Sequence, residues 1–129
     1  MTLSIVIPAY NEEKYLPRTL SALDAALADT ENYELVLVDN GSTDRTRAIA
    51  EEFGTKIVDE SVHNIGHVRN TGAAVVNLDV IVFLDADTIV RPGVFQKISA
   101  AMSDERCVGG SVAVEYLCEF RRARGCAGS

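Results

Sequence analysis

The chain has 129 residues, 47% of them hydrophobic and 24% charged, and carries a formal net charge of -7 at pH 7. This length and composition predict one globular domain with a buried core. The acidic net charge argues against nucleic acid or an anionic membrane surface as a partner. No stretch reaches the roughly 18 apolar residues of a membrane-spanning helix, so no membrane segment is predicted.

The first strand and helix are expected within residues 3–27. Residues 3–8 are apolar and β-branched and end at Pro8, which cannot donate to a ladder, and this pattern predicts a strand. Leucines at helical spacing from Leu16 to Leu27 predict a helix with one apolar stripe. Pro17 fits only the first turn, so this helix is expected to begin near Tyr15 or Leu16.

A second strand and helix follow in the same pattern. Residues 34–39 predict a strand, because an apolar run at 35–38 is followed by the carboxylate of Asp39, and turn residues come next. Ser42 or Thr43 is expected to cap the following helix, and Gly54 is expected just beyond its end. The inward face of that helix is predicted to comprise Thr46, Ile49, Ala50 and Phe53.

The alternation continues with a short strand at residues 56–59, a loop at 63–66 and a helix at 67–77. Residues 80–84 then predict a strand that is buried on both faces. Strands that alternate with helices in this way predict an α/β fold, in which a mostly parallel sheet carries helices on both faces.

The remaining residues predict one more helix and one more strand. Pro92 is expected at the first position of a helix whose apolar face carries Phe95, Ile98 and Met102, and a last strand is expected at residues 107–116. The domain is predicted to span residues 1–118, followed by an irregular tail at 119–129. The chain has three cysteines, Cys107, Cys118 and Cys126, and their spacing is not that of metal ligands. An odd number of cysteines without such spacing favours a reducing environment over a disulfide framework or a zinc site.

Polar loops follow four of the predicted strands. Because the carboxyl ends of parallel strands meet at one rim, the loops that begin at Pro8, Asp39, His63 and Asp85 are expected to converge there. Asp85 and Asp87 come directly after a buried strand. Two carboxylates at that place are suited to a divalent cation and, through it, to a diphosphate.

Each of these residues also has a purely structural interpretation. The alternatives are a helix cap or turn for Asp85 and Asp87, a turn for Asp39, a half-buried core ring for Tyr10 and a solvated helix position for Arg69. His63 and His67 are expected to be surface side chains. Turn and cap roles are expected for Ser42, Thr43 and Asp44.

Four motifs in the chain bear on its family. They are VIPAYNEE at residues 6–13, VDNGSTD at 38–44, NIG at 64–66 with RNTG at 69–72, and FLDAD at 83–87. In order and spacing, this set resembles the family 2 glycosyltransferases, which have the GT-A fold and a Rossmann-like nucleotide-binding half. The resemblance covers residues 3–110. A lone D-x-D is a weak signal, whereas the set of four is specific.

The resemblance implies a role for particular residues. The nucleotide-sugar site would comprise Pro8, Ala9, Tyr10, Asn11, Glu12, Asp39, Asn40, Arg69, Asp85 and Ala86. Within it, the Tyr10 ring would pack on the nucleobase, Asp39 would lie at the uracil or ribose edge, and Arg69 would contact the base edge or a phosphate. Asp87 would ligate Mg²⁺ or Mn²⁺ directly, with Asp85 near the ribose and the water shell of the metal.

Two departures from the family pattern affect the expected activity. Many members carry a second acidic residue after the second strand, where this chain has Asn40, so the base preference stays open. The general base and the acceptor region of inverting members would follow beyond Ser129. The chain is therefore expected to be short or truncated, with its general base elsewhere, and to bind a donor better than it transfers sugar.

The predicted function is metal-dependent, inverting transfer of sugar from a UDP-, GDP- or dTDP-sugar to a saccharide or lipid-linked acceptor. The alternatives are a non-catalytic nucleotide-sugar-binding or regulatory module and a nucleotidyltransferase. The last is disfavoured because residues 9–13 are acidic and contain no glycine to cradle a triphosphate. A cytoplasmic location is expected, either free or at the membrane face through partners, and a homo-oligomer is compatible with the sequence.

Overall fold

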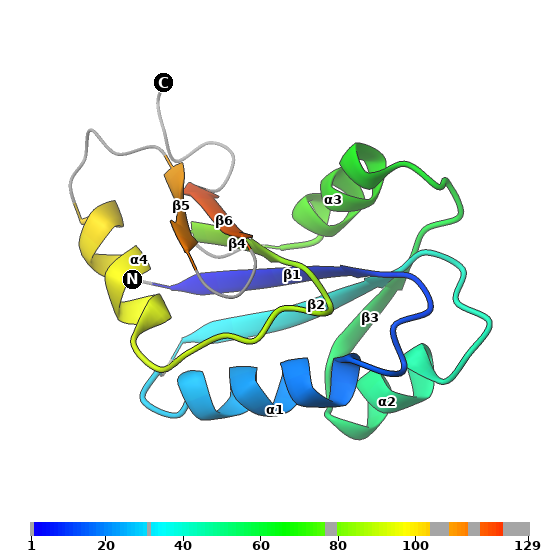
Figure 1. The fold of residues 1–129 in the computed structure, drawn as a ribbon. Helices are drawn as coiled ribbons and strands as arrows, with labels where there is room; N and C mark the ends of the chain where they lie inside the picture. The colour runs from blue at the N-terminus through cyan, green and yellow to red at the C-terminus, as the bar shows by residue number, and fades with distance from the viewer. Residues whose placement is uncertain (1, 31, 77–79, 104–108, 114–116, 123–129) are drawn as a thin grey trace.

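The computed structural model describes residues 2–30, 32–76, 80–103, 109–113 and 117–122 (Figure 1). Within them, six strands form one sheet in the order β3-β2-β1-β4-β6-β5. The strands are β1 Leu3–Ala9, β2 Tyr33–Asp39, β3 Lys56–Asp59, β4 Val80–Leu84, β5 Gly109–Ala113 and β6 Leu117–Arg122. Strands β1 to β4 run parallel to one another, and β6 runs antiparallel to both β4 and β5. The prediction of a mostly parallel sheet is confirmed.

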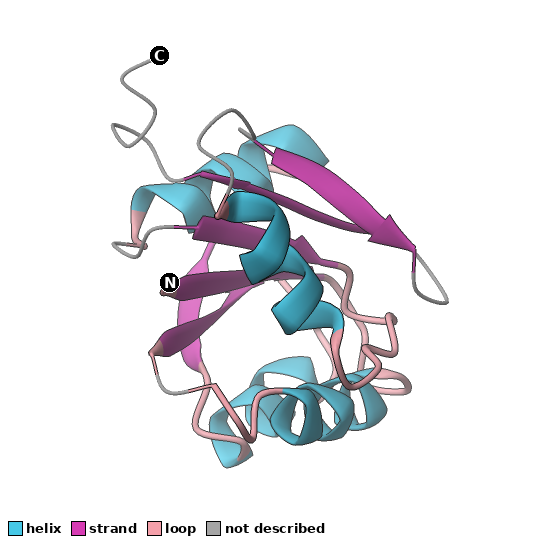
Figure 2. Cartoon of the chain, turned by 90° about the vertical axis from the view of Figure 1, so that its left-hand side faces the viewer, coloured by secondary structure: helices cyan, strands magenta, loops and turns pink. Residues whose placement is uncertain are grey.

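Helices cover both faces of the sheet, as the sequence predicted (Figures 1 and 2). They are α1 Leu16–Ala26, α2 Thr46–Glu52, α3 Ile65–Ala74 and α4 Val94–Met102. The alternation of β1 explains the two layers, because Ile5 and Ile7 pack with α1, α2 and α4, whereas Val6 packs with Val68 of α3. None of the helices in the described residues is long and apolar enough to cross a membrane.

Strand β4 is buried along its whole length, which confirms the prediction for residues 80–84. Its odd and even positions divide between the two cores: Val82 packs with the α1 layer and Phe83 with the α3 layer. A strand with two apolar faces has no solvated side, so polar groups can follow only where the strand leaves the sheet. Asp85 stands at that point.

Three helix boundaries differ from the prediction. Helix α3 begins at Ile65 rather than at residue 67, because the side chain of Asn64 accepts a hydrogen bond from the His67 N–H at 3.0 Å and caps the helix. Gly93, at φ 95, caps α4, so Pro92 lies in the turn before the helix and not at its first position. Helix α2 ends at Glu52, so Phe53 leaves the helical stripe and is 44% exposed.

The end of the chain also corrects an expectation. Glu119–Arg122, predicted to be part of an irregular tail, belong to β6, which pairs with β4 from Val80↔Arg122 to Leu84↔Cys118. Of the predicted last strand, residues 109–113 are β5, while residues 107–108 and 114–116 lie outside the described residues, as do residues 123–129. These residues form a strand because they pair with β4. Their own sequence is basic and has no periodicity, so it does not predict a strand.

Gly72 sets the distance between α3 and the sheet. A Cβ at this position would lie 2.3 Å from Val6 Cγ1 and 2.9 Å from Val38 Cγ2. Both valines are completely buried, so neither side chain has free space to move into. A glycine is therefore required for the helix to approach this closely.

We expect Gly72→Ala to lower the free energy of unfolding by about 1–3 kcal/mol, because the added methyl group overpacks the contact with Val6 and Val38. Urea denaturation followed by circular dichroism measures the effect. The control is Asn70→Ala, at an exposed position of the same helix, which we expect to change stability by less than about 0.5 kcal/mol. Equal stability of Gly72→Ala and the wild type would contradict the packing argument.

Candidate functional site

A cavity of about 500 Å³ opens at the carboxyl ends of β1, β2 and β4. At this point β1 has β2 on one side and β4 on the other, and ligands of open α/β sheets bind at such a switch in strand order. The cavity is lined by Pro8, Ala9, Tyr10, Glu12, Asn40, His63, Asn64, Ile65, Val68, Asp85, Ala86 and Asp87. Loops that are distant in sequence thus meet at one rim, as expected.

Eight of the lining residues were predicted site residues, and three predicted site residues lie outside the lining. The eight are Pro8, Ala9, Tyr10, Glu12, Asn40, Asp85, Ala86 and Asp87; the three are Asn11, Asp39 and Arg69. The remaining four, His63, Asn64, Ile65 and Val68, were not among the predicted site residues; only the loop that begins at His63 was expected at this rim. The polar cluster that begins at His63 was the available signal, although the two histidines were interpreted as surface side chains.

One edge of the cavity is acidic. Asp85 is exposed, while Asp87 and Glu12 are half-buried. Burial raises the pKa of Glu12, and the negative charges of Asp87, Asp44 and Asp85 raise it further. The negative charges at this edge therefore oppose the ionisation of Glu12, and a bound cation would lower the negative potential.

The donor atoms of this edge fit a hard divalent cation. Carboxylate oxygens are the ligands that Mg²⁺ and Mn²⁺ prefer. Among the described residues, no three His, Cys, Asp or Glu side chains are grouped closely enough to hold a metal ion by themselves. Asp85 and Asp87 thus suit a cation that takes the rest of its oxygen ligands from a bound molecule or from water.

Another edge of the cavity carries two rings. Tyr10 is 50% exposed, and its ring meets the His63 ring edge-on, with centroids 5.1 Å apart and an interplanar angle of 84°. The exposure argues against the interpretation of Tyr10 as a core ring. An exposed tyrosine face held by a neighbouring ring is a suitable surface for stacking a planar ligand.

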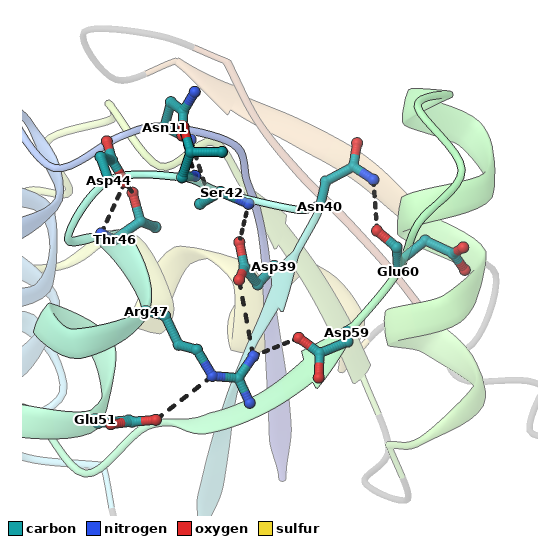
Figure 3. Close-up of polar contacts among 11 residues, drawn as sticks. Asn11, Asp39, Asn40, Ser42, Asp44, Thr46, Arg47, Glu51, Asp59 and Glu60 are labelled. Carbon is teal, nitrogen blue, oxygen red and sulfur yellow. Dashed lines mark hydrogen bonds and ion pairs between the residues drawn. The ribbon is translucent and has the colours of Figure 1, made fainter.

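Asn40 presents a hydrogen-bond acceptor of fixed orientation. Its Nδ2 donates to the carbonyl oxygen of Glu60 at 2.7 Å (Figure 3). It also donates to the carbonyl oxygen of Val62 at 3.0 Å, so both amide hydrogens are used. Two carbonyl partners also identify this atom as the nitrogen. The remaining Oδ1 has no hydrogen-bond partner among the described residues, and the side chain lines the cavity.

The segment that orients Asn40 is itself held in place. Hydrogen bonds from the Thr71 hydroxyl and the Val62 N–H lower the pKa of Glu60 and keep its carboxylate ionised. His67 Nε2 lies 3.1 Å from the same carboxylate. The loop that receives the Asn40 amide is therefore fastened to α3.

Asp39 lies beside the cavity rather than in its lining. Its carboxylate is 5% exposed and accepts a hydrogen bond from the Ser42 N–H at 3.1 Å, and its other oxygen lies 3.7 Å from Arg47 Nη1 (Figure 3). Arg47 also pairs with Asp59 and Glu51. No motif in the sequence identifies Arg47 as the partner of Asp39.

The first and second loops are bound to each other. The Asn11 N–H donates to Ser42 Oγ at 3.0 Å, and the Thr43 N–H donates to Asn11 Oδ1 at 2.8 Å. The Glu12 N–H donates to Thr46 Oγ1 at 2.8 Å. Asn11 has a φ of 51°, a conformation that asparagine tolerates better than most residues. Asn11 thus shapes the first loop from outside the cavity.

These contacts correct the predicted cap of α2. Ser42 and Thr43 bind Asn11 instead of capping the helix, and the cap residue is Arg45, which makes no side-chain capping bond. Asp44 takes over part of this role, because its Oδ1 accepts a hydrogen bond from the Thr46 N–H at 2.9 Å. A local motif cannot reveal which of several adjacent polar residues is used by a distant loop.

Arg69 lies on α3, outside the cavity lining. Its guanidinium carbon lies 5.0 Å above the centre of the Phe83 ring, within the range of a cation–π contact. The side chain is half-buried, which argues against the interpretation of Arg69 as a fully solvated helix residue. Its predicted contact with a nucleotide stays a prediction.

Comparison with known proteins identifies relatives along most of the chain. The sequence profile described as Glycosyl transferase family 2 matches residues 4–125. Validoxylamine A glucosyltransferase of Streptomyces hygroscopicus subsp. limoneus is 32% identical over 105 residues, a match that covers 77% of this chain and 23% of the relative.

Solved structures show the same fold. S. aureus TarS 1-349 in complex with UDP-GlcNAc has a TM-score of 0.74 and 25% identity, over 84% of this chain and 33% of that one. Glucosyl-3-phosphoglycerate synthase from Mycobacterium tuberculosis, in complex with Mn²⁺, UDP and glucosyl-3-phosphoglycerate, has a TM-score of 0.69 and 27% identity, over 78% of this chain and 39% of that one. The chain spans less than half the length of each of these proteins.

The acidic edge generates a prediction about stability. Because the pKa of Glu12 is raised in the folded state, that state holds the proton to a higher pH than the unfolded state does, and stability is lost as pH rises through the raised value. We therefore expect Glu12→Gln to be more stable than the wild type at neutral pH and to lose this advantage near about pH 4. Thermal melts across this pH range measure the difference.

The control for this prediction is Glu52→Gln, at an exposed position outside the cavity lining, for which we expect a small change in melting temperature. A Glu12→Gln advantage that is absent at neutral pH would show that the acidic edge does not destabilise the folded protein.

Proposed function

The chain is a member of glycosyltransferase family 2, and on this premise we propose that it forms the donor-binding part of an enzyme that transfers sugar from a nucleoside diphosphate sugar to an acceptor. The observation that carries the proposal is the cavity, whose acidic edge and ring-bearing edge are contributed by loops on one rim of the sheet. These edges match the two halves of a nucleoside diphosphate. The non-catalytic alternative is not favoured, since the relatives are named glycosyltransferases.

The proposed diphosphate end is the edge formed by Asp85 and Asp87. Asp87 would ligate Mg²⁺ or Mn²⁺ directly, and Asp85 would hold the ribose and the water shell of the metal. When bound, the metal would neutralise the charge that develops on the departing diphosphate. The Mn²⁺ and UDP bound together by glucosyl-3-phosphoglycerate synthase support this assignment.

The proposed base end is the edge formed by Tyr10, His63 and Asn40. The Tyr10 ring would stack on the base, with Pro8 and Ala9 completing the wall. Asn40 Oδ1 would accept a hydrogen bond from an N–H at the base edge. Uracil and thymine carry such a hydrogen on ring atom N3, and guanine carries one on ring atom N1, which agrees with a UDP-, dTDP- or GDP-sugar as donor.

The proposed reaction is a direct, inverting displacement. The oxygen of the acceptor hydroxyl forms a bond to the anomeric carbon while the bond from that carbon to the diphosphate oxygen breaks. The nucleoside diphosphate leaves with the electron pair, and the hydroxyl proton passes to a general base. Within this reaction, the residues of the cavity bind and orient the donor.

We expect binding of UDP to require Mn²⁺ or Mg²⁺ and to weaken at least about tenfold in Asp87→Ala. Isothermal titration calorimetry with metal and with chelator measures both effects. The control is Asp24→Ala, which removes an exposed carboxylate of α1 outside this cavity and should leave UDP affinity unchanged. Equal UDP affinity of the wild type with and without chelator would contradict the proposed function.

We also expect the cavity to prefer UDP to CDP. The two bases differ at N3, which carries a hydrogen in uracil and a lone pair in cytosine, so cytosine would oppose its lone pair to Asn40 Oδ1. Leaving a buried acceptor unmatched costs roughly 1–3 kcal/mol, which corresponds to about five- to hundredfold in affinity. A thermal-shift titration with each nucleotide and Mn²⁺ measures the ratio, and a ratio near one would rule out this role for Asn40.

A further inference from the structure

Thr19 of α1 contacts the loop that carries Asp85 and Asp87. The residue is completely buried, and its hydroxyl lies 2.6 Å from the carbonyl oxygen of Ala86, which is 67 residues further along the chain. The Tyr15 carbonyl of the same helix is a second acceptor at 3.2 Å. A hydroxyl has one hydrogen to donate, and the shorter distance assigns it to Ala86.

Ala86 stands between Asp85 and Asp87, so its geometry determines theirs. The Ala86 methyl group is buried in the core that also contains Leu16 and Leu20 of α1. Both the side chain and the carbonyl of Ala86 are therefore directed to α1, and both flanking carboxylates line the cavity. The loop is closed further by a hydrogen bond from the Thr88 N–H to the Asp85 carbonyl at 3.1 Å.

The same helix also holds the backbone of Glu12, the residue that carries the third carboxylate of the acidic edge. The N–H groups of Tyr15 and Leu16 donate to the Glu12 carbonyl at 3.1 and 2.9 Å. Helix α1 thus begins at the loop of Glu12 and, one turn later, contacts the loop of Asp85 and Asp87 through Thr19. A rigid helix with a contact at each point fixes the spacing of the two loops across the cavity.

We propose that Thr19 is a positioning residue, whose hydroxyl orients the Asp85–Asp87 loop so that its carboxylates can bind a divalent cation together with a nucleoside diphosphate. The inference rests on the proposed function of these carboxylates as the metal-binding edge. Thr19 touches neither metal nor nucleotide, and it acts through the Ala86 carbonyl. Groups that orient metal ligands in this way typically affect metal affinity by about ten- to hundredfold.

A merely structural role for the hydroxyl predicts something different. In that case its loss would lower the melting temperature while the folded protein would bind the metal as before. Metal affinity measured well below the melting temperature separates the two roles, and so does the response of nucleotide binding to metal. Positioning predicts that binding in the presence of Mn²⁺ falls while the weak binding in chelator is unchanged.

The test compares the whole chain carrying Thr19→Val, Thr19→Ser or Thr88→Val with the wild type. Thr88 is the matched control because its hydroxyl is also completely buried next to the loop but has no hydrogen-bond partner among the described residues. Mn²⁺ affinity at saturating UDP is measured from the electron paramagnetic resonance signal of free Mn²⁺, and UDP affinity is measured by calorimetry with and without chelator.

We expect Thr19→Val to weaken Mn²⁺ binding by about ten- to hundredfold, Thr19→Ser to restore it to near the wild-type value, and Thr88→Val to leave it unchanged. If Thr19→Val does not fold, Thr19→Cys replaces it, since a thiol is a weaker donor and should give an intermediate loss. Wild-type Mn²⁺ affinity in a folded Thr19→Val or Thr19→Cys variant overturns the positioning role alone. Absence of Mn²⁺-dependent UDP binding in the wild type overturns the proposed function and this inference together.

Discussion

The ladder between β1 and its two neighbours determines where the cavity can exist. Pairing with β2 continues to the end of β1, at Ala9↔Asp39, whereas pairing with β4 stops at Val6↔Phe83. Beyond that point the β4 side of β1 has no strand partner, and the crevice begins. The Ala9 carbonyl accepts the Asn40 N–H on the β2 side, so the nitrogen of Pro8 faces the β4 side. A proline, which has no N–H to satisfy, suits this unpaired position.

The loops around the crevice satisfy their polar groups mainly with one another. Residues of the first loop use side chains of the second, as the contacts of Asn11 with Ser42 and of Glu12 with Thr46 show. The second loop is fastened in turn to the segment before α3 through Asn40. Loops held in this way lose little further conformational freedom when a ligand binds, which leaves more of the interaction energy for affinity.

Local patterns were sufficient to predict the framework of this chain. Apolar runs identified β1, β2 and β4, and leucine spacing identified α1, because burial on a sheet or helix face imposes a short period on the sequence. The boundaries that failed depend on a single backbone or capping choice, such as the left-handed Gly93 or the Asn64 cap. The antiparallel β6 failed for a different reason, since its pairing comes from β4 and not from its own residues.

In the candidate site, too, some features could be predicted from the sequence and others could not. Residue types at strand ends, helped by the family resemblance, indicated Tyr10, Asn40, Asp85 and Asp87, all of which line the cavity. What the sequence did not reveal are the supporting contacts. Arg47 reaches Asp39 across eight residues and Thr19 reaches Ala86 across 67, and such pairs depend on side-chain directions that exist only in the folded chain.

The negative charge of the cavity links the binding of metal to the binding of nucleotide under the proposed function. A chain of net charge -7, with three carboxylates at one edge of its cavity, would repel a bare diphosphate. The pKa of Glu12, which is raised first by burial, is raised further by the same kind of repulsion from Asp87, Asp44 and Asp85. A divalent cation reverses the sign of the interaction, since it attracts both the carboxylates and the phosphate oxygens. Under the proposed function, metal and nucleotide must therefore strengthen each other's binding by the same factor, as linkage requires. The acidic edge then acts against nucleotide binding in the absence of metal, so its negative charge is a source of selectivity and not only a means of ligation.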